Sequence, residues 1–458
     1  MVKIFFKRIL EKAGVDKAIA FSSGARVVQG LTGVGSVFFI ATFLTGVEQG
    51  FYFTFGSIVS LQVFFELGLT GIMTQYVAHE ASALKLTDND EFIGDEAHHS
   101  RLASLQNFCL KWYSILSIVI LIVLLVVGFV FFSKYSSDNQ ASDISWKLPW
   151  ILICIGTALK VFQAPFTSIL NGLGFVKEMS EITFWQQSII PIFTWIGLIA
   201  GLKLYVVGVS YILTVVIWFL YCRRKSLTKI LINLSRHPVT QKVAYLKEIF
   251  PYQWRIALSW VSGYFIFQLF NPVLFATEGA VVAGQMGMTL TIITSIQAFS
   301  MSWVNTKIPR FSSLIAQENY VELDGLFSKT LKQTTTVCFV LLAMMLLMVF
   351  LLDITNFTFN GKVLAERFLP YVPMICMMIA VYLHQYVNAW ATYLRCHKKE
   401  PFLFFSICCG IACCISTLGL GSHYGLYCIT IGYCIIYLFF TPWAYNIFKS
   451  KKNEWHGQ

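Results

Sequence analysis

The stretch AFSSGARVVQGLTGVGSVFFIATFLT, residues 20–45, is long enough to cross a membrane and carries an arginine inside it. Counting about 1.5 Å per residue from a start near residue 18 places Arg26 roughly 12 Å into a hydrocarbon core about 30 Å thick. A charge at that depth costs on the order of 2.5 to 3.5 kcal/mol, so it normally faces a watery or protein-lined interior and has a partner. Gly30 and Gly33 lie on the same helix face. We therefore predict that this face borders a cavity; a structural ion pair between Arg26 and Glu66 is the alternative.

The composition is that of a polytopic membrane protein. Of the 458 residues, 57% are hydrophobic and only 12% are charged, and the mean hydropathy is +0.67. No polar stretch is long enough to bury a core of its own, so no soluble domain is expected. The 12 cysteines lie mostly in apolar segments and are interpreted as packing residues.

Apolar windows of about 20 residues predict twelve membrane-spanning helices. The windows cover residues 20–44, 50–77, 109–132, 148–171, 182–202, 204–222, 252–275, 280–303, 333–353, 369–393, 401–420 and 424–447. Twelve crossings place both termini on one side, and the loops on that side hold 26 Lys and Arg residues, against 5 on the other side. Because basic residues accumulate in cytoplasmic loops, both termini are predicted to be cytoplasmic. The net charge of +11 therefore gives no support to nucleic-acid binding.

Two internal correspondences divide the chain into halves. Arg26, Gly30 and Gly33 of the first span correspond to Arg255, Ser259 and Ser262 of the seventh. The fourth and tenth spans align without gaps at Cys154 with Cys376, Gln163 with Gln385, and Lys177-Glu178 with Lys399-Glu400. Both pairs of spans have parallel orientation. We therefore predict an all-α polytopic membrane protein with 12 transmembrane helices in two six-helix bundles, related by a pseudo-two-fold axis along the membrane normal.

The predicted segments follow from this division. They are a cytoplasmic N-terminal segment at residues 1–17, an N-terminal bundle at 18–222, a basic cytoplasmic linker at 223–250, a C-terminal bundle at 251–447 and a cytoplasmic tail at 448–458. Within the linker, residues 239–250 are interpreted either as a helix along the membrane surface or as a helical extension of the next span.

Three cations and one carboxylate occupy membrane depth. Lys160 lies near the middle of the fourth span, and Glu66 lies in the cytoplasmic half of the second. Arg255, only a turn beyond Pro251, either reaches the cavity or snorkels to the interface. A cavity with several cations and few carboxylates suits an anionic ligand, because Arg binds phosphate through two hydrogen bonds and Lys adds a point charge. The predicted substrate-binding residues are Arg26, Arg255, Lys160 and Glu66.

Small residues and prolines mark possible hinges. Asn271-Pro272 is predicted to break the seventh span near its outer end, Pro165 to interrupt the fourth, and Pro191 lies within the fifth. Such kinks occur at cavities and hinges, and also without function. The predicted hinge or cavity-lining residues are Gly30, Gly33, Ser259, Ser262 and Pro272.

Signals for an enzyme or a metal site are poor. The chain has no GxSxG, Walker or HExxH pattern, and His98, His99 and His397 lack metal-ligand spacing. We therefore predict no enzyme activity, no cofactor and no metal ion.

The N-terminal third resembles a known family. The run GFYFTFGSIVSLQVFFELGLTGIMTQYVAHE, residues 50–80, follows an arginine-bearing, glycine-rich first span, and the turn GLGFVKE occupies residues 172–178. With the twelve-span layout, these features resemble polysaccharide or O-antigen (Wzx-type) flippases of the multidrug/oligosaccharidyl-lipid/polysaccharide exporter superfamily. The resemblance implies two bundles around a cationic cavity that opens alternately inward and outward. It also places Arg26 and Arg255 where related lipid II flippases carry cavity arginines, although those relatives have two further helices.

The resemblance implies a flippase or exporter for surface polysaccharide biosynthesis, which moves a polyprenyl-pyrophosphate-linked oligosaccharide across the bacterial cytoplasmic membrane. The expected partners of this multi-pass monomer are the lipid-linked anionic oligosaccharide, membrane lipids and a coupling ion, H⁺ or Na⁺. A multidrug or cation antiporter of the same superfamily is the first alternative, and it should keep an acidic cavity. An integral-membrane polysaccharide polymerase is the second, and it would need a larger external loop than the longest one here, of about 14 residues.

Overall fold

A computed structural model describes residues 17–456, except for 88–89, 91, 136–143 and 398. The predicted N-terminal segment therefore lies almost wholly outside the described residues. The long helices are α2 (Lys17–Phe43), α3 (Gly46–Val59), α5 (Leu69–Ala81), α6 (Glu96–Tyr135), α7 (Lys147–Gly172), α8 (Val176–Ile199), α9 (Tyr205–Arg224), α10 (Leu227–Arg236), α12 (Phe250–Phe267), α14 (Ala280–Asn305), α16 (Tyr320–Ile354), α17 (Tyr371–Arg395), α18 (Leu403–Ile415) and α19 (Gly421–Trp455). Shorter elements are α4 (Val63–Glu66), α11 (Tyr245–Glu248), α13 (Phe270–Thr277), α15 (Ile308–Ala316), and the strand pairs β1 (Leu84–Leu86) with β2 (Phe92–Gly94) and β3 (Thr358–Phe359) with β4 (Lys362–Val363).

The contacts divide the chain into two compact units, and neither is continuous in sequence. Unit 1 comprises Met1–Thr32, Leu61–Ser133 and Ser145–Trp260. Unit 2 comprises Gly33–Ser60, Lys134–Ile144 and Val261–Gln458. Residues 33–60 thus pack with helices from the C-terminal half, and the two six-helix bundles with the boundaries given above stay a prediction.

The helices have the length and surface of membrane spans. In the described part of the chain, nine helices are long and apolar enough to cross a membrane, or ten if the bent pair Gly46–Glu66 and Leu69–Ala81 is one span. On α6, exposed apolar side chains recur every three or four residues, at Ile115, Ile118, Ile122, Val126 and Val130. A continuous line of exposed apolar side chains along one face of a helix is typical of contact with lipid. The predicted all-α, multi-pass membrane fold is confirmed.

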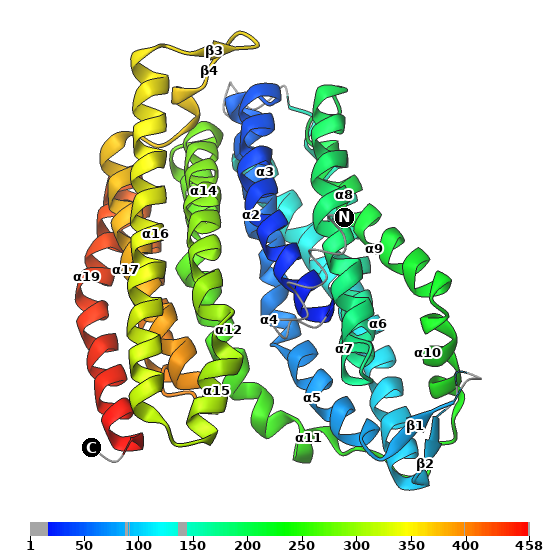
Figure 1. Cartoon of the computed structure of the whole chain (residues 1–458). Coiled ribbons are helices and arrows are strands. Elements are labelled where there is room, and N and C mark those ends of the chain that lie inside the picture. Colours follow the sequence, from blue (N-terminus) through cyan, green and yellow to red (C-terminus); the bar gives the residue numbers. More distant parts are fainter. Residues whose placement is uncertain (1–16, 88–89, 91, 136–143, 398, 457–458) are drawn as a thin grey trace, which may run out of the picture. The chain divides into compact units, whose positions relative to one another are not determined.

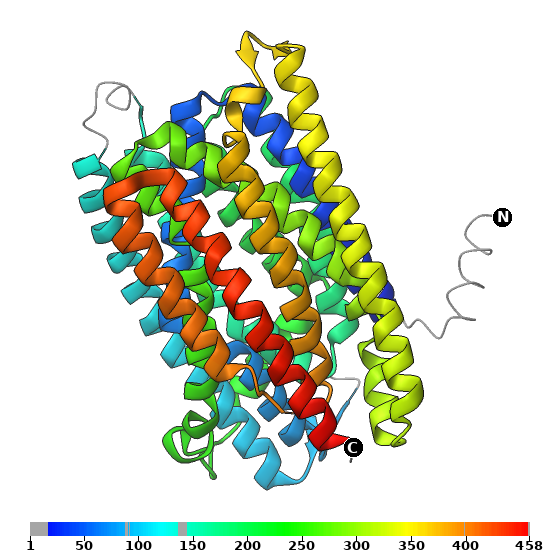
Figure 2. The ribbon, with the colours of Figure 1, turned by 90° about the vertical axis from the view of Figure 1, so that its left-hand side faces the viewer.

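Two further predicted spans fall outside that count. The apolar part of α2, Val28–Phe43, is shorter than the others. Residues Leu403–Trp455 are counted as a single span, but the backbone leaves the helical conformation at Gly425, where φ is 70°. The Phe405 ring lies 5.7 Å from the Phe440 ring, which requires the chain to reverse between them. In Figure 2, α18 (orange) and α19 (red) accordingly form a hairpin.

Unit 2 contains a very close crossing of α3 and α14. A Cβ at Gly50 would lie 1.9 Å from the carbonyl oxygen of Ala280, and one at Gly284 would lie 2.9 Å from the Gly50 nitrogen. Glycine at both positions lets the two backbones touch. The Gln49 side chain then donates a hydrogen bond of 2.8 Å to the Gly284 carbonyl. Beside this crossing, α14, α16, α17 and α19 pack side by side (Figure 1).

Unit 1 uses glycines in the same way between α7 and α9. A Cβ at Gly156 would lie 2.6 Å from Cβ of Tyr211, and one at Gly208 would lie 2.8 Å from the Ile153 nitrogen. A third glycine, Gly172, sits equally close to α5. Helix α7 is therefore held between α5 and α9 (Figure 1), which fixes the face that carries Lys160.

The interruptions of the helices differ in part from those predicted. The seventh span does break beside Asn271-Pro272, because α12 ends at Phe267 and α13 begins at Phe270. Pro165 does not divide the fourth span, because α7 stays helical through it, and the predicted bend at this proline stays a prediction. An additional break, described below, occurs in the second span.

The linker is not one surface helix. Helix α10 covers Leu227–Arg236, but residues 239–244 have no regular structure and only Tyr245–Glu248 forms a short helix. The Ser100 hydroxyl accepts hydrogen bonds of 2.8 Å from the backbone N–H groups of Thr240 and Gln241. These side-chain bonds replace the helical ones, so both helical interpretations of residues 239–250 are wrong for the first half of the segment.

Candidate functional site

The second span breaks directly after Glu66. Helix α4 ends there, and the next two residues, Leu67 and Gly68, have left-handed conformations with φ of 50° and 69°. A left-handed leucine is strained, and such outliers cluster at functional sites. The Glu66 carboxylate accepts a hydrogen bond from the Thr70 side chain and interacts electrostatically with Lys160. A carboxylate at membrane depth, directly before the break, therefore lies within electrostatic range of a predicted cation.

Lys160 is an exposed lysine in the middle of a membrane helix. It lies halfway along the 26 residues of α7, about 20 Å from either helix end, so its side chain cannot reach an interface. Its ammonium group lies 5.0 Å from the centroid of the Tyr211 ring on α9, within the range of a cation–π interaction. The structure thus brings together two of the four predicted substrate-binding residues, Lys160 and Glu66.

Three other buried polar groups lie in unit 1, the same unit as this pair. Tyr113 on α6 is fully buried and interacts electrostatically with Glu66. Its hydroxyl, and the Oε1 atoms of Gln62 and Gln163, are buried without a hydrogen-bond partner among the described residues. Unpaired polar atoms are costly at membrane depth, so a ligand or water with hydrogen-bonding groups would stabilise them. Sequence reasoning missed Tyr113 and Gln62, because neither carries a charge.

The two arginines cannot be added to this cluster. Arg26 lies in α2 and Arg255 in α12, but the side chains of both lie outside the described residues. The cationic clamp formed by Arg26 and Arg255 stays a prediction.

The predicted small residues lie at helix contacts and at half-buried positions. A Cβ at Gly33 would lie 2.8 Å from the Ser295 hydroxyl of α14. Ser262 is buried, and a Cβ at Gly410 of α18 would lie 2.9 Å from its Cβ. Gly30, Ser259 and Pro272 are half-buried. The hinge or cavity-lining role of all five stays a prediction.

A second polar cluster lies within unit 2. The Gln297 side chain bonds to the His384 ring at 2.9 Å, and the neighbouring Gln385 donates to the Thr334 hydroxyl at 3.0 Å. The Oε1 atom of Gln385 is buried and has no partner among the described residues. The only sequence signal for this cluster was the alignment of Gln385 with Gln163.

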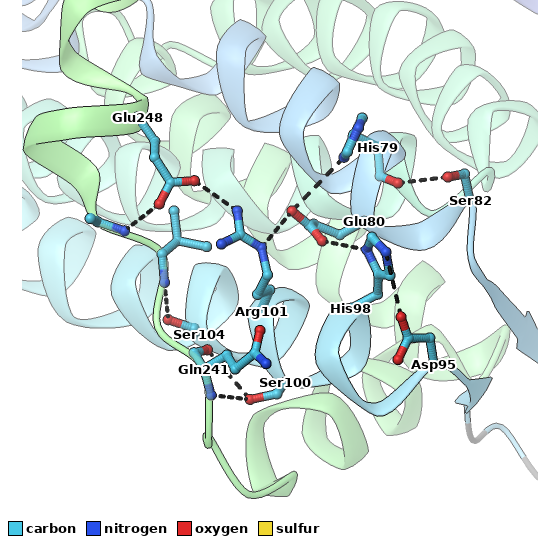
Figure 3. A network of polar contacts seen from close by, with 12 residues as sticks. His79, Glu80, Ser82, Asp95, His98, Ser100, Arg101, Ser104, Gln241 and Glu248 are labelled. Atoms are coloured by element: carbon cyan, nitrogen blue, oxygen red, sulfur yellow. Dashed lines mark hydrogen bonds and ion pairs between the residues drawn. The ribbon is translucent and has the colours of Figure 1, made fainter.

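A third network joins α5, α6 and α11 at the end of unit 1 that the basic loops predict to be cytoplasmic. Glu80 is only 3% exposed, and it accepts hydrogen bonds from Arg101 at 3.0 Å and from the His98 ring at 2.8 Å. Arg101 also donates to Glu248 at 2.7 Å (Figure 3). The Arg101 hydrogen bond lowers the pKa of Glu248 below its ordinary value. Arg101 thus holds the linker against the membrane helices.

Comparisons with known proteins reveal the fold but no close relative. No protein-family model matches the chain, and no curated protein matches it. A multidrug resistance MATE family transporter of the MOP superfamily, in an inward-facing conformation, is similar with a TM-score of 0.67 and 14% identity over 95% of this chain and 99% of its own. The lipid II flippase MurJ, in an inward closed conformation, gives a TM-score of 0.56 and 13% identity over 93% of this chain and 86% of its own.

A third similar structure is a MOP superfamily transporter from Pyrococcus furiosus. Its binding pocket is described as having reverse polarity, which suggests a different function for that protein, and it gives a TM-score of 0.58 and 13% identity over 96% of this chain and 97% of its own. All three are described as transporters or flippases rather than as enzymes. At these identities the likeness establishes the fold: the chain is a multi-pass membrane protein with the fold of the MOP superfamily transporters.

Proposed function

We propose that the chain is a flippase that moves a polyprenyl-pyrophosphate-linked oligosaccharide from the cytoplasmic to the outer leaflet of the bacterial inner membrane. The observation that carries the proposal is the position of Lys160 halfway through α7, with its ammonium group 5.0 Å from the Tyr211 ring, in a unit that also holds buried, unpaired amide and hydroxyl groups. A lipid-linked glycan presents phosphates to a cation and hydroxyl groups to amides. The cluster in unit 1 offers both kinds of partner.

Charge separates this function from other functions of the same fold. Lys160, Arg26 and Arg255 outnumber the single carboxylate of Glu66 at membrane depth. A drug or cation antiporter would need the opposite balance, because its cargo is positively charged. The description of the P. furiosus transporter, in which reverse pocket polarity suggests a different function, supports pocket charge as the relevant criterion.

The remaining parts of the proposal follow the predicted topology. Twelve spans form two six-helix bundles at residues 18–222 and 251–447, with both termini in the cytoplasm. Arg26 and Arg255 join Lys160 in binding the pyrophosphate or acidic sugars, the lipid tail stays in the bilayer, and rocking of the bundles reverses access. An H⁺ or Na⁺ gradient supplies the energy, and the chain acts as a monomer.

The proposal is tested by changing Lys160 in cells whose only copy of the gene carries the variant. Lys160→Met removes the charge but keeps the length of the side chain. Surface glycan should fall strongly, and the lipid-linked oligosaccharide should accumulate in the cytoplasmic leaflet. Lys160→Arg should restore part of the export, because it restores the charge. Lys203→Met, at the end of a span, is the matched control and should export normally.

Normal surface glycan in the Lys160→Met variant, at an unchanged protein level, would refute the role of Lys160. Neutralising Arg26 and Arg255 together tests the clamp separately.

The multidrug or cation antiporter is the second candidate, since a transporter described as a multidrug resistance protein shares the fold. It predicts that deletion of the gene sensitises cells to cationic drugs and leaves surface glycan intact.

A further inference from the structure

Three side chains with metal-binding atoms meet in unit 1 where α6 begins and α10 ends, away from the clusters at membrane depth. Glu96 and His99 lie on the first turn of α6, and His237 follows the last residue of α10. One carboxylate oxygen and one ring nitrogen from each histidine all lie within 4.8 Å of one another. His237 lies 138 positions from His99 and 141 from Glu96, so local spacing in the sequence does not reveal the grouping.

The orientation of His237 is set by a backbone carbonyl. Its Nδ1 atom lies 3.1 Å from the carbonyl oxygen of Pro238. A carbonyl oxygen can only accept, so Nδ1 carries the proton and donates. In the neutral ring, the lone pair is then on Nε2. Histidines that bind metal ions are typically held in this way, with the other ring nitrogen donating to a carbonyl or carboxylate.

The Nε2 atom of His237 faces the carboxylate of Glu96. The distance between Nε2 and Oε1 is 3.5 Å. Two ligand atoms at about 2.1 Å from a tetrahedral ion are separated by roughly 3.4 Å. A lone pair and a carboxylate at this separation repel each other unless a cation lies between them or a proton converts the contact into an ion pair.

His99 supplies the third ligand atom. Its ring stacks on that of His237, with centroids 3.5 Å apart and planes inclined by 28°. The neutral imidazole ring is the form that binds metal ions. One of its ring nitrogens lies within 4.8 Å of the ligand atoms of Glu96 and His237.

A cavity opens in front of these ligand atoms. It has a volume of about 500 Å³, and its lining includes Asp90, Phe92, Glu96, His99, Asn233 and His237. Its space leaves room for water at the coordination positions that the protein does not fill. Two histidines and one carboxylate with open positions match the preference of Zn²⁺ and similar ions.

We propose that Glu96, His99 and His237 form a binding site for a divalent transition-metal ion of the Zn²⁺ type, which joins the end of α10 to the start of α6. The site does not depend on the transported substrate, so its test is independent of the test of the flippase proposal.

The test uses the purified full-length protein without a polyhistidine tag, stripped of metal ions. Titration with Zn²⁺ in a calorimeter should give one site per chain. Binding of Co²⁺, followed by its absorption spectrum, should indicate nitrogen and oxygen ligands rather than the thiolates of the 12 cysteines. His99→Ala and His237→Ala should each weaken Zn²⁺ binding tenfold or more.

Two further variants keep the test decisive. Glu96→Gln changes a side chain that is 67% exposed, so it should fold normally and still lose affinity. His423→Ala removes an exposed histidine of unit 2 and should bind Zn²⁺ as the unchanged protein does. The proposal is overturned if no one-to-one binding occurs, which would leave a His237–Glu96 ion pair only, or if His423→Ala lowers the affinity as much as His237→Ala.

Discussion

Replacing Gly50 by alanine should force α3 and α14 apart within unit 2. The added Cβ would lie 1.9 Å from the carbonyl oxygen of Ala280, and 2.5 and 2.8 Å from its carbonyl carbon and Cα. These are backbone atoms, which cannot rotate away as a side chain does. The contact can be relieved only by moving one helix.

The magnitude follows from this geometry. Ordinary van der Waals contact begins near 3.4 Å, so the two helices must separate by more than 1 Å. Overpacking costs about 1–3 kcal/mol, and the separation also weakens the hydrogen bond from Gln49 to Gly284, worth about 0.5–1.5 kcal/mol. The higher helix propensity of alanine returns about 1 kcal/mol. We expect a net loss of about 2 kcal/mol, or roughly thirtyfold in the equilibrium constant of unfolding.

Gly56→Ala on the same helix is the matched control. No atom lies within 4 Å of a Cβ at Gly56, so this change should be neutral or stabilise the protein by up to about 1 kcal/mol. Unfolding in detergent can be followed by the reaction of a thiol-specific dye with the buried cysteines Cys338, Cys409 and Cys413 of unit 2. Equal stability of the Gly50→Ala and Gly56→Ala variants would refute the close crossing.

Two further predictions concern the network around Arg101. Arg101→Ala leaves the buried Glu80 carboxylate without its guanidinium partner and should cost about 3 kcal/mol, whereas Arg310→Ala, from an exposed ion pair, should cost less than about 1 kcal/mol in the same unfolding assay. The lowered pKa of Glu248 stabilises the folded state at pH values above the ordinary pKa of 4.5, and this contribution is lost as the pH falls through the lowered value. Proteolysis of residues 237–244 should therefore increase in acid. A Glu248→Gln variant has no carboxylate to titrate at this position, so it should not show this increase. The same increase in the variant would contradict the assignment of the effect to Glu248.

The spans could be predicted from the sequence because hydrophobicity is a local property. Twenty apolar residues in succession need no knowledge of their neighbours to be recognised, and α6 and α16 are clear examples. The network that holds the linker could not be found in this way. Arg101 bonds to Glu80, 21 residues away, and to Glu248, 147 residues away, and all three look like solvated loop charges in the sequence.

Helix breaks show a second limit. Proline is the conspicuous signal, yet α7 continues through Pro165, where one missing hydrogen bond is tolerated. The second span instead breaks at Leu67, a residue with no tendency toward a left-handed conformation, and Gly68 is its only local signal. The sequence placed Glu66 in an unbroken helix, with Arg26 as its candidate ion-pair partner, so the electrostatic interaction of Glu66 with Lys160 was not predicted.

The structure shows that Gln163 and Gln385, which correspond in the sequence alignment of the two halves, also have similar hydrogen bonding. In unit 1, the Gln163 amide nitrogen donates to the Thr167 hydroxyl, and in unit 2 that of Gln385 donates to the Thr334 hydroxyl. In both side chains Oε1 is buried without a partner among the described residues. Leaving an amide oxygen unpaired costs about 1–3 kcal/mol, and an apolar residue of similar size would avoid that cost. Packing alone therefore does not explain the two amides, whereas a bound polar ligand or water does.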